Sequence, residues 1–178
     1  MRIVRGRWAG VALVSPSGRV RPTAETLRDA CLTALGPDLE DARVLDLFAG
    51  TGALGLEALS RGAASVDFVE NGRASLHALK ANVARVRARN VTRVFVKDVF
   101  AFVQGLAEGA YDLALADPPY TSTLAERLAR LWLEKNFCRV LAVEHAAGRK
   151  MPGRGKTHLA AEGAFTVYRR REGGGAAG

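Results

Sequence analysis

Short apolar runs alternate with amphipathic segments along most of the chain. The apolar runs predict strands at 43–48, 66–70, 93–96, 112–116, 138–144, 157–160 and 164–169. Segments with apolar residues at helical spacing lie between the first five runs, at 53–61, 73–87, 98–107 and 122–134. Short buried strands that alternate with helices are typical of an α/β fold with a mostly parallel sheet. The last two runs meet around Glu162-Gly163, so we expect an antiparallel hairpin at the sheet edge.

The first forty residues depart from this alternation. Two short apolar and basic runs, Ile3-Val4 and Val11–Val14, are separated by glycines and predict a small β-hairpin arm over residues 1–20. Thr23 then has the features of a helix N-cap, and Gly36-Pro37 is expected to end that helix. A chain of 178 residues allows one main domain, which we expect over residues 21–172. A disordered tail is expected over residues 173–178.

Composition changes this picture through its charge. Basic residues outnumber acidic residues by 26 to 18, a formal net charge of +8. A basic surface favours a polyanionic partner such as nucleic acid. The alternative for the overall charge is a genomic bias toward arginine, and the alternative for the basic N-terminal arm is a solvated face that only aids solubility. No apolar run approaches the ~20 residues of a membrane span, and the two cysteines and three histidines lack metal-ligand spacing. We therefore expect a cytoplasmic monomer without metal or membrane contact.

A glycine-rich loop follows the first strand of the predicted α/β region. Gly50-Thr51-Gly52-Ala53-Leu54-Gly55 fits the G-x-G-x-x-G pattern at the turn into a helix, where glycines let a ligand approach the backbone closely. Alone, the pattern also fits an ordinary tight turn. Two acids favour a nucleotide site. Glu70 ends the next strand, where it could accept from ribose hydroxyls, and Asp98 follows the third, where it could accept from an adenine amino group.

Acidic residues at the strand ends distinguish between two classes of cofactor. Carboxylates at the carboxyl ends of adjacent strands, where open α/β sheets bind ligands, would repel the pyrophosphate of a dinucleotide. They complement the positive sulfonium and amino group of S-adenosylmethionine (AdoMet). The sequence therefore predicts AdoMet as cofactor and S-adenosylhomocysteine as product. The residues expected to contact the cofactor are Asp46, Phe48, Gly50, Gly52, Glu70, Asn71, Asp98 and Val99.

The fourth strand runs directly into Asp117-Pro118-Pro119-Tyr120. Two prolines lack N–H groups, so the strand cannot continue as an interior member of the sheet. The Asp117 carboxylate and the Pro118 carbonyl could accept both hydrogens of a planar amine and so localise the nitrogen lone pair, while Tyr120 could stack on a base. A simple strand terminator is the alternative. We take Asp117, Pro118, Pro119 and Tyr120 as catalytic candidates for methyl transfer to an exocyclic base amine.

Longer stretches of the sequence resemble the RsmD family of bacterial 16S rRNA guanine-N2 methyltransferases. The similarity is carried by Arg21-Pro22-Thr23, the stretch 46–63, Glu70, Asp98 and Asp117–Tyr120. It implies a class I, Rossmann-like methyltransferase fold with seven strands and an N-terminal hairpin. It further implies a target guanine in 16S rRNA, within an assembled or partly assembled 30S subunit. One departure lies in the first helix, where the family pattern Arg-x-x-Leu-Phe-Asn keeps Arg28 but lacks Phe-Asn.

Basic residues near the N-terminus supply candidate rRNA contacts. We expect a clamp formed by Arg5, Arg7, Arg19 and Arg21, with Thr23 and Arg28 as further contacts. An adenine-N6 DNA or RNA methyltransferase would suit the same tetrapeptide, but sequence-specific DNA enzymes normally add a recognition domain for which this length leaves no room. A catalytically silent rRNA-binding assembly factor is the alternative from a different functional class.

Overall fold

One mixed sheet organises the part of the chain that the structure describes. The computed structural model describes residues 1–15, 22–160 and 163–170. Within these ranges seven strands form a sheet in the order β3-β2-β1-β4-β5-β7-β6. The strands are β1 (Arg43–Leu47), β2 (Ser65–Val69), β3 (Thr92–Phe95), β4 (Tyr111–Ala116), β5 (Cys138–His145), β6 (Lys156–Ala160) and β7 (Gly163–Arg169). β1 to β5 are parallel, and β7 is antiparallel to both of its neighbours, which confirms the predicted edge hairpin.

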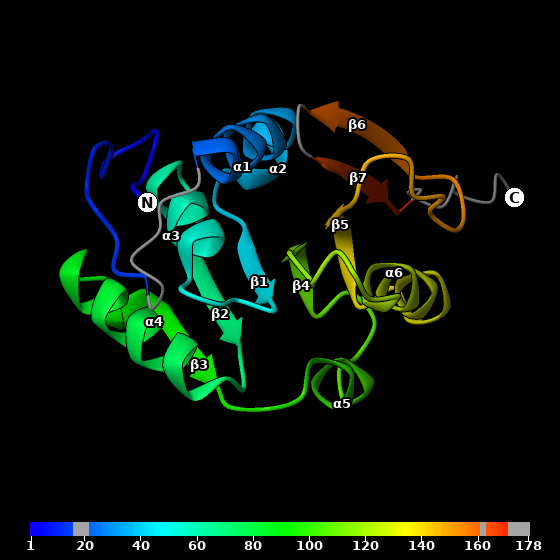
Figure 1. The fold of residues 1–178 in the computed structure, drawn as a ribbon. Helices are drawn as coiled ribbons and strands as arrows, with labels where there is room; N and C mark the ends of the chain where they lie inside the picture. Colours follow the sequence, from blue (N-terminus) through cyan, green and yellow to red (C-terminus); the bar gives the residue numbers. More distant parts are fainter. Residues whose placement is uncertain (16–21, 161–162, 171–178) are drawn as a thin grey trace, which may run out of the picture.

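Helices cover both faces of this sheet (Figure 1). They are α1 (Pro22–Ala34), α2 (Gly36–Leu39), α3 (Ala53–Ser60), α4 (Arg73–Arg85), α5 (Val99–Gln104) and α6 (Leu124–Lys135), with a 3-10 turn η1 (Arg89–Val91). One core cluster packs α1, α3 and α4 on one face, and a second packs α5 and α6 on the other. Val44 belongs to the first cluster and Leu45 to the second, because successive strand residues point to opposite faces.

Two helices differ from the sequence prediction. The first helix ends before Gly36-Pro37 as expected, but a short second helix that was not expected, α2, begins there and has Pro37 in its first turn. Proline is tolerated at that position because the missing N–H would have no partner inside the helix. α5 ends at Gln104 rather than 107, since Gly105 forms its C-cap and returns its backbone N–H to Phe102.

The N-terminal segment is built into the fold rather than detached from it. Its antiparallel pairing consists of a single bridge, between Arg2 and Ala12, in place of two regular strands. Ile3 and Leu13 are buried in the core cluster that contains α1 and α3. The expected boundary at residue 20 and the expected tail over 173–178 lie outside the described residues.

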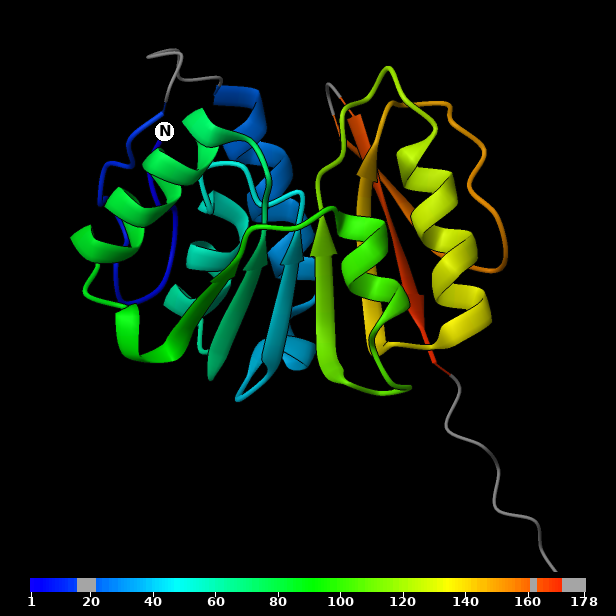
Figure 2. The same cartoon turned by 90° about the horizontal axis from the view of Figure 1, so that it is seen from below.

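The parallel strands bring the sequence motifs to one edge. Figure 2 shows β1 to β5 pointing in the same direction, so the loops that follow them gather at their carboxyl ends. The register pairs Leu47 of β1 with Val69 of β2 and with Ala116 of β4. The glycine loop, Glu70 and Asp117 therefore follow neighbouring strands at the same level of the sheet.

Candidate active site

The loop after β1 has a backbone conformation that residues other than glycine rarely adopt. Gly50 and Gly52 have φ of +55° and +78°, and a Cβ on Gly52 would lie 2.3 Å from Cδ1 of Leu79. Glycine is required at position 52 by both its backbone and its neighbour. Phe48, at φ 59°, shares this left-handed region, which is unusual for a bulky residue, and its ring meets Phe100 edge to face at 6.1 Å.

Asp46 ties this loop to the helix that follows it. The side chain is 1% exposed, and its Oδ2 accepts a 2.9 Å hydrogen bond from the backbone N–H of Gly55. Burial raises the pKa of Asp46 well above its usual range; the Gly55 N–H opposes the shift, and the negative charges of Asp117 and Glu70 add to it. The last two effects show that three of the expected acids lie within electrostatic reach of one another.

Glu70 joins the loops that follow β1 and β2. Its Oε2 accepts from the backbone N–H of Gly50 at 2.7 Å, and its Oε1 accepts from Asn71 and Gly72 at 2.9 and 2.6 Å. A carboxylate has about four lone-pair sites. Three of them serve the protein backbone, which fixes the orientation of the carboxylate and leaves capacity for a further donor.

Asp98 and Val99 begin α5. Asp98 is the N-cap, and its Oδ1 accepts a 2.9 Å hydrogen bond from the backbone N–H of Ala101. The expected role at an adenine would therefore fall to the second oxygen of this exposed side chain. Val99 is 5% exposed and packs in the core with α6, so chiefly its backbone could face a ligand.

The residues of the Asp117-Pro118-Pro119-Tyr120 segment after β4 differ in solvent exposure. Pro118 is buried, whereas Pro119 and Asp117 are exposed. Asp117 is open to solvent on one side, but the protein around it desolvates the carboxylate and raises its pKa to about 6, against the attraction of Arg28. The Tyr120 carbonyl accepts a 2.8 Å hydrogen bond from Arg149, whose guanidinium also pairs with Glu126 at 2.6 Å.

The acids at this edge lack the partners that acids elsewhere in the chain have. Among the residues that the structure describes, none of Asp46, Glu70, Asp98 and Asp117 forms an ion pair, although eleven ion pairs are formed by other groups. Burial and the nearby charges of Asp117 and Glu70 disfavour the ionised form of Asp46, and a bound cation would stabilise it. The arrangement fits a positively charged ligand without phosphate.

The arginines expected to contact rRNA differ in their exposure to solvent. Arg28 is 4% exposed, and its guanidinium donates to Glu57 at 3.2 Å and to the Arg2 carbonyl at 2.6 Å. Buried and committed to protein groups, it is not placed to contact RNA directly. Arg5 is exposed and bidentate with Asp29, while Arg7 is exposed and stacks on Trp8 at 4.0 Å. The remaining candidates, Arg19, Arg21 and the side chain of Thr23, lie outside the described residues.

Three polar residues near the site were not recognised as important from the sequence. Glu57 is fully buried and accepts from two arginines and two backbone N–H groups. Asn82, also fully buried, bonds both backbone groups of Val14 and the carbonyl of Thr51, so it links the N-terminal segment to the glycine loop. Glu144, at the end of β5, was interpreted only as a strand terminus. The sequence did contain a sign of its importance, because Glu144 is an acid at the carboxyl end of a predicted strand, as are the other expected acids.

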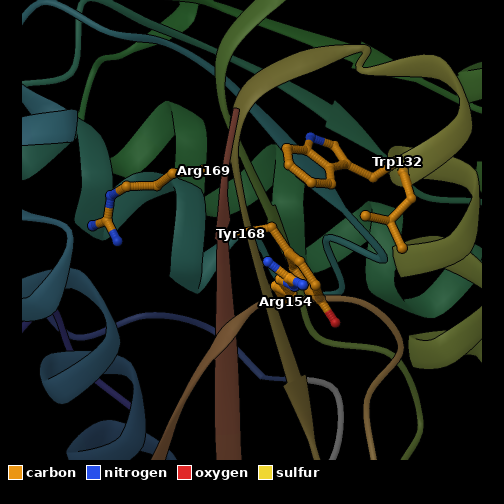
Figure 3. Close-up of a pocket in the computed structure, with 5 residues that line it drawn as sticks. Trp132, Arg154, Tyr168 and Arg169 are labelled. Carbon is orange, nitrogen blue, oxygen red and sulfur yellow. The ribbon is translucent and has the colours of Figure 1, made fainter. Parts of the chain in front are cut away.

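A cavity lies elsewhere on the molecule. It measures about 350 Å³ and is lined by Trp132, Leu133, Arg154, Tyr168 and Arg169 (Figure 3). Figure 3 shows Trp132 and Tyr168 on one side of β7, while Arg169 points away on the other. The Arg169 guanidinium pairs with Asp38. None of the expected site residues lines this cavity, so the chemistry of the carboxyl edge, rather than cavity size, identifies the candidate site.

The described residues contain neither a candidate metal site nor a helix that could span a membrane. No cluster of three His, Cys, Asp or Glu side chains in these ranges has the geometry to hold a metal ion. The helices in the same ranges are too short or too polar to cross a bilayer.

Known proteins resemble the chain over most of its length. A family model described as conserved hypothetical protein 95 matches residues 1–163. Ribosomal RNA small subunit methyltransferase D of Escherichia coli K12 is 39% identical over 137 residues, which are 76% of this chain and 68% of that protein. A solved structure of a hypothetical protein from Thermus thermophilus has a TM-score of 0.81 and 30% identity, covering 96% of this chain and 99% of the other.

A more distant structure shares the fold. It is the T. thermophilus 16S rRNA N2 G1207 methyltransferase RsmC in complex with AdoMet and guanosine, with a TM-score of 0.67 and 24% identity. It is matched over 87% of this chain and 44% of its own length. Together with the strand order, these similarities confirm the predicted class I methyltransferase fold.

Proposed function

The chain belongs to the RsmD family, whose model is the one described as conserved hypothetical protein 95, and from this premise we propose that it methylates small-subunit ribosomal RNA. AdoMet is the proposed donor, and the proposed acceptor is the N2 amine of one guanine in 16S rRNA of an assembling 30S subunit. The observation that carries the proposal is the group of carboxylates at the carboxyl edge, Asp117 included, that form no ion pair with any described residue.

The acceptors at the carboxyl edge suit AdoMet. When bound, AdoMet supplies an electrophilic methyl group on a positive sulfonium. Glu70 would hold ribose hydroxyls with its remaining lone pairs, and Asp98 would accept from the adenine amine with its free oxygen. A cation would offset the burial of Asp46 and the repulsion from Asp117 and Glu70, which together raise the pKa of Asp46. The remaining wall and backbone contacts would come from Phe48, Gly50, Gly52, Asn71 and Val99.

Asp117 has the properties of an acceptor for an amine. The carboxylate and the Pro118 carbonyl would accept the two N–H hydrogens, which localises the nitrogen lone pair toward the methyl group. The methyl–sulfur bond would break as the nitrogen–carbon bond forms, with the electron pair remaining on sulfur, and Asp117 would accept the proton that the methylated nitrogen loses. A pKa of about 6 for Asp117 suits this role, because a general base works best with a pKa near the operating pH. Tyr120 borders the base. The choice of guanine over adenine rests on the family.

Methyl transfer to isolated subunits tests the proposal. Purified protein, labelled AdoMet and small subunits from cells that lack this protein should yield labelled rRNA, whose digest contains N2-methylguanosine by mass spectrometry. Asp117→Ala should lower the rate roughly 10²–10⁴-fold, the range of a lost acid–base group, while AdoMet binding by calorimetry persists. Glu134→Ala, an exposed acid at the far end of α6, is the matched control and should behave as wild type.

Other outcomes identify the alternatives. N6-methyladenosine in the digest would replace the guanine assignment with adenine. Tight binding to subunits without any transfer of label would instead indicate an assembly factor. Near wild-type turnover by Asp117→Ala would show that this carboxylate is not the proton acceptor. Naked 16S rRNA assayed in parallel shows whether the assembled subunit is needed.

A further inference from the structure

Glu144 lies beside the proposed catalytic acid although the sequence separates them by a full strand and helix. β4 and β5 are parallel, and the register pairs Ala116 with Val143, so Asp117 and Glu144 follow at the same level. Ala116 and Val143 both point into the core that contains α6. The next residue of each strand therefore faces the opposite side, toward α1. In agreement, Arg28 of α1 is close enough to lower the pKa of both acids.

The carboxyl of Glu144 is committed to Tyr120. The side chain is 8% exposed, and a hydrogen bond from the Tyr120 side chain is one of the effects that lower its pKa. The register agrees, because Glu144 pairs with Phe165 of β7, two residues from Gly163. The ring of Tyr120 lies against Gly163 of β7, where an added Cβ would come within 2.8 Å of the phenol oxygen. Leu27 of α1 lies beside the same position, with its Cδ2 atom 3.1 Å from where a Cβ of residue 163 would be. The absence of a side chain at Gly163 thus makes room for the ring, and Glu144 holds its polar end.

Glu144 is a poor candidate for a base but a good hydrogen-bond partner. Burial raises its pKa well above the usual range, and the negative charge of Asp117 raises it further, against the attraction of Arg28 and the Tyr120 hydrogen bond. The described residues supply no ion pair for it. Two adjacent carboxyl groups resist holding two negative charges. A neutral group of the same shape should therefore serve equally well at position 144.

We propose that Glu144 is a positioning residue for methyl transfer, which anchors the Tyr120 hydroxyl and so holds the aromatic ring at the border of the base site. This inference rests on the proposed methyltransferase function. Without the anchor, the half-buried phenol loses this hydrogen bond and the ring can shift away from Gly163. Binding of AdoMet would depend little on the anchor, because no hydrogen bond or ion pair within the described residues joins Glu144 to an expected cofactor contact.

Three variants test the anchor. Glu144→Leu removes the hydrogen-bond partner and should lower kcat about tenfold, the upper range for a lost hydrogen bond, with the AdoMet Kd within about twofold of wild type. Glu144→Gln keeps an acceptor and should restore kcat to within about threefold. Combining Glu144→Leu with Tyr120→Phe should cost no more than the larger single effect, since both remove one interaction.

A second phenol–carboxylate pair supplies the matched control. The Tyr111 hydroxyl donates to Asp67 at 2.6 Å, away from the carboxyl edge. Tyr111→Phe should lower the melting temperature without changing kcat. Wild-type kcat in Glu144→Leu, or a fall in Glu144→Gln as deep as in Glu144→Leu, would overturn the proposal. So would additive losses in the double variant.

A direct probe of Tyr120 separates failure of the anchor from failure of the proposed function. With Cζ of tyrosine labelled by ¹³C, the three tyrosines give three NMR signals. The Tyr120 signal should move in Glu144→Leu and return in Glu144→Gln. An unmoved signal refutes the anchor even in an active enzyme. A moved signal in a protein that transfers no methyl group refutes only the function.

Discussion

Two groups of acids on the same side of the sheet are organised in opposite ways. The carboxylate of Glu57 in α3 is fully buried and accepts from Val4 and Arg5 backbone N–H groups, from Arg28 and from Arg61. Within the described ranges, Asp117 and Glu144 have no comparable set of hydrogen-bond donors. Arg28 affects both groups, but its direct contact is with Glu57, and it reaches the other two acids only through its charge.

The difference separates a structural network from a functional one. A buried carboxylate with all its hydrogen bonds made holds three segments together, here the N-terminal segment, α1 and α3. A carboxylate left without donors costs stability, and proteins keep such groups where a ligand will complete them. Neutralising the two kinds of acid should therefore change stability in opposite directions.

The largest effect is expected in the closed network. Glu57→Ala leaves Arg28 buried without its partner, which should cost about 3–5 kcal/mol of unfolding free energy. For a chain of this size that is a fall in Tm of roughly 6–20 °C, measured by differential scanning calorimetry. An unchanged Tm would show that the network contributes nothing net. Glu134→Ala, with no partner to lose among the described residues, is the control.

Asp117 should show the reverse pattern. Asp117→Asn removes the charge that the site disfavours, so Tm should not fall, while kcat should drop roughly 10²-fold or more. The same calorimeter and the methyl-transfer assay measure both quantities. A lower Tm together with reduced activity would place Asp117 among the structural acids and remove the contrast with Glu57.

The pH dependence of methyl transfer follows from the raised pKa of Asp117. Because the acceptor must be ionised, kcat should fall as pH drops through about 6, by about tenfold per unit below it. Stability should respond in the opposite sense. A raised pKa means that the folded state holds the proton more tightly, so this site favours folding as pH falls from about 6 toward 4. In Asp117→Asn both trends should disappear.

The smallest effect concerns the arginines of the N-terminal segment. Arg5 already pairs with Asp29, whereas Arg7 pairs with no acid among the described residues. Arg7→Ala should reduce the slope of log affinity for subunits against log salt by about 0.7–0.9, one phosphate contact. Arg5→Ala should change it less. Filter binding across a salt series measures both, and equal slopes in all three proteins would exclude Arg7 from the interface.

Much of the fold could be predicted from local patterns. Alternation of apolar runs and amphipathic segments placed the seven strands within a residue or two, because strand and helix periods are properties of short segments. The glycine loop was recognisable for the same reason, since glycine at position 52 is required by the local backbone angle φ and by the nearby Leu79 side chain. The end of the first helix before Gly36-Pro37 was predicted, but α2 was not, because proline can begin a helix as well as follow one.

Long-range partners could not be predicted in this way. Arg28 was expected at the RNA, but its guanidinium is buried against Glu57, a residue 29 positions away. Glu144 was interpreted as a strand end, although the register of β4 and β5 puts it level with Asp117. No spacing in the sequence records either contact, because sheet order and helix packing decide which distant side chains meet.

The sequence by itself determined the class of chemistry. Acids at the strand ends, a glycine loop and Asp117-Pro118-Pro119-Tyr120 are local signals, and each needs only its own strand to be interpreted. The tertiary structure decided the state of each charged group. Whether a carboxylate is paired, desolvated or close to a second acid depends on residues brought together from distant parts of the chain, and this separates Glu57 from Asp117 and Glu144.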